Sequence, residues 1–339
     1  MYFPDEETMS EQITIIGLGQ IGSSIGMALK AHDVNLRRVG HDKDPRVARE
    51  SQSVGAVDDV RYNLPASVRE AKLVILALPL AGVHETLQVI APDLQEGTLV
   101  LDTAPAKAKV AAWATELLPP GRFYVGLTPA LNPGYLHETG TGVSAARADL
   151  FERGLMVVNA PPGTPGNVFS LAMELVNLLG ARPLLMDTLE TDGIFSSMHL
   201  LPQLAAAALL NTTVDQPGWH EARKLGGRPY ATVSGGTAYH DDAPSLGQSA
   251  LHSREHMVRV LDAYIDSLIE VRENIEANDL EALTRRLEAA RKGHDRWLDE
   301  RTAGEWLQGQ GQAVDAPSFG QRLSQMFLGS RMTQRSPRK

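Results

Sequence analysis

A glycine-rich stretch near the N-terminus has the spacing of a phosphate-binding loop. It follows the apolar run 13–16 and reads Gly17-Leu18-Gly19-Gln20-Ile21-Gly22. In a strand–loop–helix unit the first glycine permits a tight turn, the second lets the backbone approach a pyrophosphate, and the third allows the helix to pack on the strand. A helix that opens near Ile21 would add N–H donors and a partial positive charge. These six residues therefore predict a dinucleotide-binding site.

An acidic residue follows at the spacing that distinguishes the two common dinucleotides. Asp42 lies twenty residues after Gly22, at the end of the expected second strand. A carboxylate there accepts hydrogen bonds from the ribose hydroxyls and repels a 2′-phosphate, so it favours NAD over NADP. Lys43 would partly neutralise such a phosphate, and NADP therefore stays open. We expect Asp42 and Lys43 to contact the cofactor.

Two later segments end apolar runs in a similar way. Leu78 and Pro79 end the run that begins at Leu73, and Asp102 and Thr103 follow the run 99–101. The carboxyl ends of parallel strands meet at the sheet edge where a dinucleotide binds. All four residues are therefore expected to line the cofactor site, with Asp102 and Thr103 near the nicotinamide. The alternative is that both segments are ordinary turns.

The elements that would position these residues alternate between strands and helices. Short buried strands are expected at 13–16, 38–40, 73–78, 99–101 and 123–125, and helices at 23–31, 45–53, 83–90 and 107–117. Strict alternation indicates an α/β fold with a doubly wound parallel sheet covered on both faces, a Rossmann domain. We expect this domain to span 13–188, after a flexible N-terminus at 1–12.

The second half has a mostly helical pattern and is expected to form a substrate and dimerisation domain over 189–308. Before it, a helix is predicted at 167–179 and a last strand at 184–186. The alanine-rich segment 200–210 is apolar all round, which is typical of a helix buried on every side. A long amphipathic helix is predicted at 249–277, and Asp279 is expected to cap another that runs toward Lys292.

The fully apolar helix suggests a partner, so we expect a homodimer built through the helical domain. The alternative is that the helix is buried within one subunit. The stretch 309–339 is rich in Gln, Gly, Ser and Arg, and is expected to be a mobile tail or an arm laid on a neighbour.

Composition narrows the function classes. The 339 residues are 43% hydrophobic and 22% charged with a net charge of −9, which is typical of a globular protein and disfavours a nucleic-acid surface. The chain has no cysteine, which removes disulfides, thiolate catalysis and cysteine-based zinc sites and fits a reducing cytoplasm. No signal peptide, membrane span or metal site is expected. We expect instead a focused site that binds a small anionic substrate.

Taken in order, these segments resemble the prephenate/arogenate dehydrogenase family of tyrosine biosynthesis over about residues 13–288. The matching segments are GLGQIGSS, VGHDKDP, the ALP strand end, DTAPAK, FYVGLTP, LLGARPLLMD and the Leu201-Pro202 pair before an Ala/Leu helix. The resemblance implies a Rossmann domain with a helical dimerisation domain. It also implies oxidation of a cyclohexadienol by hydride transfer to NAD, with loss of carbon dioxide.

The chain departs from the family pattern at its chemical centre. Thr128 stands where the family's GGHPMAG-like segment has the histidine that abstracts the hydroxyl proton, and Pro105 stands where its DVGSVK turn has a serine. The SHLPH segment becomes His199-Leu200-Leu201-Pro202-Gln203. The family's later arginine, which pairs with a substrate carboxylate, has no evident match in 230–240. Lys107 survives from the family turn and could hold an anionic group, or could be a solvated lysine at a helix start.

Oxidising an alcohol requires a base for the hydroxyl proton, and threonine is not one near neutral pH. His199 is the candidate substitute, because imidazole is a base in this range. The alternative is that it only packs against the apolar helix. His137 and His240 are weaker candidates. In this hypothesis Thr128 contacts the hydroxyl, and Lys107 or Arg228 pairs with the carboxylate.

Three functions follow. The first is an NAD-dependent dehydrogenase acting on prephenate or arogenate. The second is a dehydrogenase or reductase of the same fold acting on another hydroxyacid or on an imine. The third is a catalytically silent NAD-binding protein, which the missing catalytic residues suggest. Turnover assays with these substrates would separate the three.

Overall fold

A computed structural model describes residues 11–32, 36–238, 242–304, 319, 320 and 323. The described residues divide into two compact units. The first contains those of Met1–Asn132, Gly140–Asp187 and Gln310–Lys339, and the second contains those of Pro133–Thr139 and Thr188–Gly309. The chain therefore passes from unit 1 to unit 2 between Asp187 and Thr188. The short segment Pro133–Thr139 also belongs to unit 2.

Unit 1 is built on a sheet whose strand order is β3-β2-β1-β4-β5-β6-β7-β8. Its strands are β1 (Glu11–Ile16), β2 (Leu36–His41), β3 (Asp59–Val60), β4 (Ala71–Leu76), β5 (Leu99–Asp102), β6 (Phe123–Ala130), β7 (Leu155–Asn159) and β8 (Arg182–Leu185). All neighbouring pairs are parallel except β6–β7, which is antiparallel. The order reverses between β1 and β4, which is where doubly wound sheets bind a dinucleotide.

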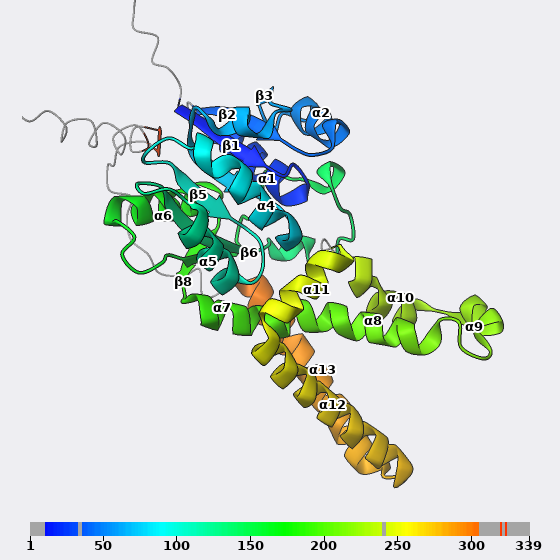
Figure 1. Cartoon of the computed structure of the whole chain (residues 1–339). Coiled ribbons are helices and arrows are strands. Elements are labelled where there is room, and N and C mark those ends of the chain that lie inside the picture. The colour runs from blue at the N-terminus through cyan, green and yellow to red at the C-terminus, as the bar shows by residue number, and fades with distance from the viewer. Residues whose placement is uncertain (1–10, 33–35, 239–241, 305–318, 321–322, 324–339) are drawn as a thin grey trace, which may run out of the picture. The chain divides into compact units, whose positions relative to one another are not determined.

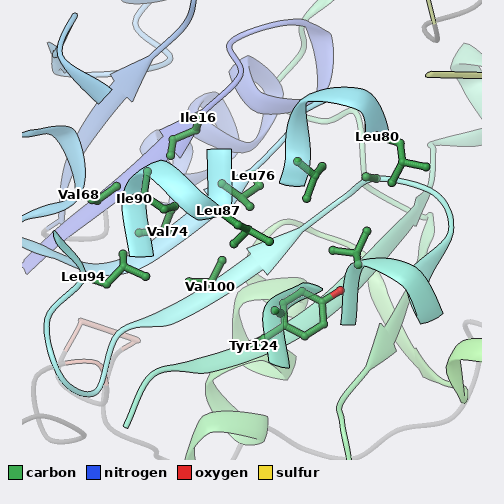
Figure 2. Close-up of a cluster of buried hydrophobic side chains, with 14 of the residues drawn as sticks. Ile16, Val68, Val74, Leu76, Leu80, Leu87, Ile90, Leu94, Val100 and Tyr124 are labelled. Atoms are coloured by element: carbon green, nitrogen blue, oxygen red, sulfur yellow. The ribbon is translucent and has the colours of Figure 1, made fainter. Parts of the chain in front are cut away.

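Helices connect these strands (Figure 1). They are α1 (Gln20–Ala31), α2 (Pro45–Ser53), α3 (Leu64–Val68), α4 (Leu80–Ile90), α5 (Lys107–Leu117) and α6 (Gly166–Leu178), with short turns η1 (Ala91–Asp93) and η3 (Val143–Ala145). Alternate residues of the strands face opposite sides of the sheet. On one side Val74 and Leu76 of β4 pack with Leu80, Leu87 and other side chains of α4 and with α5, and the ring of Tyr124 lies in the same cluster (Figure 2).

The Rossmann fold class predicted from the sequence is confirmed, and each expected strand and helix of the first half corresponds to an observed element. The prediction of strict parallel alternation is wrong at one place, because β7 returns antiparallel to β6. The sequence reasoning also missed β3, α3 and β7. The two residues of β3 and the five of α3 are too few to show a period. Glu11 and Gln12 were expected in a flexible N-terminus but begin β1.

Unit 2 is helical. Its elements are η2 (Pro133–Tyr135), α7 (Thr188–Phe195), the π-helical turn η4 (Ser196–Leu200), α8 (Leu201–Thr213), α9 (Trp219–Leu225), α10 (Arg228–Ser234), η5 (Gly235–Ala238), α11 (Ala243–His252), α12 (Arg254–Glu276) and α13 (Leu280–Ala303). Asp279 caps α13 as predicted, since its Oδ1 accepts a hydrogen bond from the Ala282 N–H at 2.9 Å. The predicted helix 249–277 is instead two helices that meet at Ser253.

Unit 2 does not enclose the apolar helix, so the alternative in which this helix is buried within one subunit is wrong. Only Gln203 and Ala206 of α8 are buried. The continuous helical stretch Thr188–Thr213 has 26 residues and an apolar window of mean hydropathy 1.4, of which 22% is buried. It therefore meets the length and composition of a membrane-crossing helix, which the sequence reading did not expect. Length and composition do not distinguish such a helix from one covered by a partner. The predicted tail 309–339 lies almost wholly outside the described residues.

Candidate functional site

The glycine loop between β1 and α1 needs two of its glycines for packing. Gly17 has a φ of +89°, and a Cβ there would lie 2.3 Å from the carbonyl oxygen of Ala77. A Cβ on Gly22 would lie 1.9 Å from the carbonyl oxygen of Gly17. The first glycine therefore lets the loop pass close to the end of β4, and the third lets α1 pack onto the loop.

Gly19 is different, because its missing side chain faces open space. A Cβ on Gly19 would meet no atom of the described chain within 4 Å. Gly19 is also the N-cap of α1, and no side chain there bonds the first free N–H groups of the helix. An open glycine at an uncapped helix N-terminus fits a pyrophosphate, whose oxygens accept hydrogen bonds from such N–H groups.

Other residues of the loop and of α1 make their contacts through side chains. Leu18 is buried, and the Nε2 of Gln20 donates to the carbonyl oxygen of Ala145 at 3.0 Å. Close by, the Arg147 N–H donates to the Ser24 hydroxyl at 2.9 Å. The side chains of α1 thus hold the segment around η3. These contacts could not be predicted from the sequence, since they join residues more than 120 positions apart.

Asp42 lies at the end of β2 and bonds directly to the glycine loop. Its Oδ2 accepts a hydrogen bond from the Leu18 N–H at 2.8 Å, and its Oδ1 accepts one from the Asp44 N–H at 2.8 Å. Both carboxylate oxygens keep further lone pairs for ribose hydroxyls. Lys43 is exposed beside it. The two residues lie where the sequence placed them, next to the loop.

The predicted residues after β4 and β5 lie at the same carboxyl edge. The Cδ2 of Leu78 is 2.8 Å from the position of a Cβ on Gly17, so this side chain lies against the glycine loop. Pro79 is exposed and precedes α4. The Thr103 N–H donates to the carbonyl oxygen of Leu76 at 3.0 Å, which continues the β4–β5 pairing into the turn.

The structure differs from the expectation for Asp102 and Lys107. Their side chains are 0% and 1% exposed, and the Lys107 Nζ lies 2.9 Å from the Asp102 Oδ1. The other carboxylate oxygen accepts the hydroxyl hydrogen of Tyr124 at 2.6 Å. Neither side chain is placed to contact a ligand, because each is enclosed and bonded to the other. The predictions that the Lys107 side chain binds an anion and that the Asp102 side chain contacts the cofactor directly are therefore wrong. Both side chains instead bond within unit 1, behind the turn that joins them.

Thr128 lies on β6, two residues beyond Gly126, which pairs with Asn159 of β7. Its side chain is buried, and its hydroxyl has no hydrogen-bond partner among the described residues. A buried hydroxyl without a partner is costly, so it is suited to accept or donate a bond to a ligand. It cannot act as a base near neutral pH.

His199 belongs to unit 2, within the π-helical turn η4. Its ring packs against that of Phe195 with centroids 4.3 Å apart, and it is half-buried. Its carbonyl oxygen accepts a hydrogen bond from the Nε2 of Gln203 at 3.1 Å. π-Helical turns inside helices are frequent at functional sites. Of the weaker candidates, His137 is exposed and His240 lies outside the described residues.

Tyr124 is the residue of this region that sequence reasoning missed. It stands in the run Phe123–Val125, which was interpreted only as a strand. The alternation of Tyr124, Gly126 and Thr128 on one face of β6 was the available signal, because residues two apart share a face.

The described part of the chain holds no group of three or more His, Asp or Glu side chains that could bind a metal ion.

Comparison with known proteins agrees with this geometry. Residues 25–185 match the family model of the nucleotide-binding domain of prephenate dehydrogenase, a match that begins just after the glycine loop. The chain is 26% identical to the prephenate dehydrogenase of Bacillus subtilis, over 85% of this chain and 76% of the relative. It is 25% identical to the cyclohexadienyl dehydrogenase of Zymomonas mobilis, over 84% of this chain and 95% of the relative.

The fold is also that of a solved structure. The prephenate dehydrogenase of A. aeolicus, crystallised with hydroxyphenyl propionate and NAD+, superposes with a TM-score of 0.73 at 18% identity. The match covers 86% of this chain and 99% of that one. The strand order, the loop geometry around Gly17 to Gly22 and these similarities lead to one conclusion. The chain belongs to the prephenate/arogenate dehydrogenase family.

Proposed function

We propose that this protein is an NAD-dependent dehydrogenase that oxidises prephenate or arogenate with loss of carbon dioxide. The observation that carries the proposal is the glycine loop bonded to Asp42, with its helix N-terminus open at Gly19. The substrate class is that of the similar prephenate and cyclohexadienyl dehydrogenases. An acid rather than a base or a small polar group at the end of β2 supports NAD as the cofactor, since a 2′-phosphate would meet a carboxylate.

The reaction requires a hydride acceptor, which is the cofactor, and a proton acceptor, which is a side chain of the protein. NAD+ held at the glycine loop would supply the acceptor for the hydride on the carbon that carries the substrate hydroxyl. The hydroxyl proton must go to a base, which leaves a ring ketone. The ring carboxylate then leaves as carbon dioxide while its bonding electrons move through the ring to the ketone oxygen, which takes up a proton and completes an aromatic phenol. A positioned base contributes roughly 10²- to 10⁴-fold to the rate of such a step.

The proposed base is His199. The turn η4 and the ring of Phe195 fix its backbone and orient its imidazole. Thr128 is proposed to hydrogen-bond the substrate hydroxyl, which would give its buried Oγ1 a partner. With Lys107 bonded to Asp102, Arg228 at the first turn of α10 is the remaining candidate for the substrate carboxylate, and it is exposed.

We further propose that the protein is a cytoplasmic homodimer formed through unit 2. Leu268, Ile269 and Ile265 of α12 are 51%, 37% and 49% exposed, and α8 leaves most of its apolar side chains partly open. Contiguous exposed apolar surface is typical of protein interfaces. A second copy would cover this surface without requiring a membrane. The absence of cysteine suits a reducing compartment.

Steady-state assays with the purified protein and NAD+ test the proposed activity. Growth of NADH absorbance with prephenate or arogenate supports it, and the ratio of kcat/KM values identifies the preferred substrate. Turnover of other hydroxyacids or imines, but of neither cyclohexadienol, would contradict the substrate class. NAD+ binding by calorimetry without turnover of any of these compounds would favour a catalytically silent binding protein. This is the second candidate function, because Thr128 stands where a basic residue is expected.

A further inference from the structure

Three polar side chains lie together inside unit 1, next to the carboxyl end of β5. Asp102, Lys107 and Tyr124 are 0%, 1% and 7% exposed. The Lys107 Nζ lies 2.9 Å from the Asp102 Oδ1 and 3.1 Å from the Asp102 carbonyl oxygen, and the Tyr124 hydroxyl donates to the Asp102 Oδ2 at 2.6 Å. Removing charged groups from water is costly, and only close mutual bonding offsets that cost. We call these residues the buried cluster.

The cluster closes a turn. Asp102 and Lys107 stand at the two ends of 103–106, and the Asp102 Oδ1 also accepts the Ala104 N–H at 2.9 Å. Within the turn, Ala106 has a φ of +60°, a left-handed conformation that is unfavourable for a residue with a Cβ. Such strained residues persist only where the surroundings determine their conformation. Here the ion pair across the turn and the hydrogen bond from the Tyr124 hydroxyl hold Ala106 in this conformation.

The cluster packs closely against the backbone of Gly126. Gly126 lies opposite Asp102 in the β5–β6 pairing. A Cβ at this glycine would lie 3.0 Å from the Lys107 Cδ and 3.0 Å from the Tyr124 hydroxyl oxygen. The glycine therefore opens the face of β6 over which Lys107 passes to reach Asp102.

The position of the turn indicates what it serves. Asp42 at the end of β2 marks the adenosine side of the site, and the strand order reverses between β1 and β4. A dinucleotide that crosses this reversal extends its second half past the ends of β4 and β5. The turn 103–106 continues β5 at that edge and bonds to the end of β4 through the Thr103 N–H.

We propose that Asp102, Lys107 and Tyr124 are positioning residues that hold the turn 103–106 in the conformation that receives the nicotinamide half of the cofactor. This inference rests on the nucleotide binding of the proposed function, but not on the identity of its substrate. The family's serine position in this turn is occupied here by Pro105, so a hydroxyl contact from that position is absent. The backbone of the turn then carries the contact, and its conformation depends on the cluster.

The test compares two ligands that differ only in the nicotinamide. Hydrogen exchange of the backbone amides of 103–107 is followed in the free protein, with NAD+ and with ADP-ribose, which lacks the nicotinamide ring. The variants are Tyr124→Phe, which removes one hydroxyl, and Lys107→Met, which removes the ammonium. Lys109→Met is the matched control, because it lies on the same helix and its ammonium lies over the Trp113 ring instead.

In the wild type and in Lys109→Met, NAD+ is expected to slow exchange in 103–107 more than ADP-ribose does. In Tyr124→Phe and Lys107→Met, this NAD+-specific protection is expected to disappear while the Kd for ADP-ribose changes less than about twofold. Where prephenate or arogenate is turned over, kcat at saturating NAD+ is expected to fall about tenfold or more, as misplacement of a reacting group predicts.

Equal protection by the two ligands in the wild type, or NAD+-specific protection that survives in Tyr124→Phe, would overturn the inference. Tyr124→Phe decides the matter even if Lys107→Met does not fold. A wild type that shows the ligand difference but turns over no cyclohexadienol would leave the positioning role standing and reject the proposed substrate. A wild type that binds neither ligand would reject the nucleotide site and the inference together.

Discussion

The Leu18 N–H donates a hydrogen bond to the Asp42 carboxylate at 2.8 Å, which joins the glycine loop to the end of β2. One side chain thereby has two tasks. It fixes a loop that leads into the helix N-terminus at Gly19, and it presents a negative charge where the adenosine ribose is expected. Cofactor choice and loop geometry are coupled through this contact, so a change at Asp42 should alter both.

Asp42→Asn should weaken NAD+ binding roughly 10- to 100-fold, since hydrogen bonds to a charged group are worth about 1.5–3 kcal/mol. NADP+ should lose less or gain, because the repulsion of its 2′-phosphate is removed. Calorimetric Kd values for both dinucleotides measure this. Asp44→Asn is the control, because it removes a charge two residues away and asparagine is an equally good N-cap for α2. An equal loss in both variants would contradict a specific role for Asp42.

Gly19→Ala and Gly22→Ala should separate binding from folding. At Gly19 the added methyl group enters open space, so the melting temperature should stay the same while NAD+ binding falls at least tenfold through steric conflict with the pyrophosphate. At Gly22 it would collide with the Gly17 carbonyl oxygen, so both stability and binding should fall. Thermal unfolding with and without NAD+ gives both quantities.

Gly247→Ala is the control for these two glycine variants. Gly247 lies on an exposed face of α11, and a Cβ there meets no described atom within 4 Å. The variant should bind NAD+ normally and should be slightly more stable, since alanine is the better helix former. Normal NAD+ binding by Gly19→Ala would show that the pyrophosphate does not approach this glycine.

Local signals made the cofactor half of the site predictable. The spacing of Gly17, Gly19 and Gly22 after an apolar strand, and of Asp42 after them, follows from the geometry of one β–α–β unit, so a short stretch of sequence contains it. Lys107 was misjudged for the opposite reason. Its burial depends on Asp102, Tyr124 and the open face of Gly126, and Tyr124 and Gly126 come from a strand that begins sixteen residues later.

The helical half shows a second limit. The break at Ser253 has neither proline nor glycine, and both flanking helices continue the same apolar period, so the sequence indicated one helix. The surface of α8 was interpreted as fully buried because its composition is apolar all round. The chain itself buries only Gln203 and Ala206 of this helix. An apolar composition does not say what covers a helix, so it could not predict this outcome.

The ion pair between Arg38 and Asp58 should make stability depend on acid pH. Burial by itself would raise the pKa of Asp58, but hydrogen bonds from the Arg38 side chain and backbone N–H lower it below the ordinary value of 3.8. A folded-state pKa below the unfolded one stabilises the fold above the unfolded value, and this contribution is lost as the pH falls through the folded value. The contribution should therefore be complete at neutral pH and decline below 3.8.

Urea unfolding of wild type and Asp58→Asn across this range measures the difference. The two free energies of unfolding should differ most near neutral pH and converge in acid. Asp59→Asn is the control, since its partners Arg37 and Arg61 are 35% and 49% exposed, against 7% for Arg38, and pairs between exposed side chains contribute about 0–1 kcal/mol. A difference between wild type and Asp58→Asn that does not change with pH would contradict the role of this pair.

The apolar face of α12 should be an interface between two copies. Leu268→Glu places a charge on a side chain that is 51% exposed in the single chain, so it should cost little in folding but should disrupt a dimer. Light scattering during size-exclusion chromatography should show a dimer for the wild type and a monomer for the variant. Val54→Glu, at an exposed valine of unit 1, should remain dimeric. A monomeric wild type would reject the proposed homodimer.

His199 should carry the proton transfer that Thr128 cannot perform. His199→Ala should lower kcat by about 10²- to 10⁴-fold, the contribution of a positioned base, while the Kd for NAD+ stays unchanged because the cofactor contacts lie in unit 1. His220→Ala is the control for the loss of an imidazole from unit 2, since His220 is an exposed surface residue of α9. Added imidazole should restore part of the activity of His199→Ala, because a free base can replace the missing one. That recovery separates a proton acceptor from a residue that only packs against Phe195, whose loss imidazole in solution would not repair. Full activity of His199→Ala would move the base to another residue and leave the cofactor site as described.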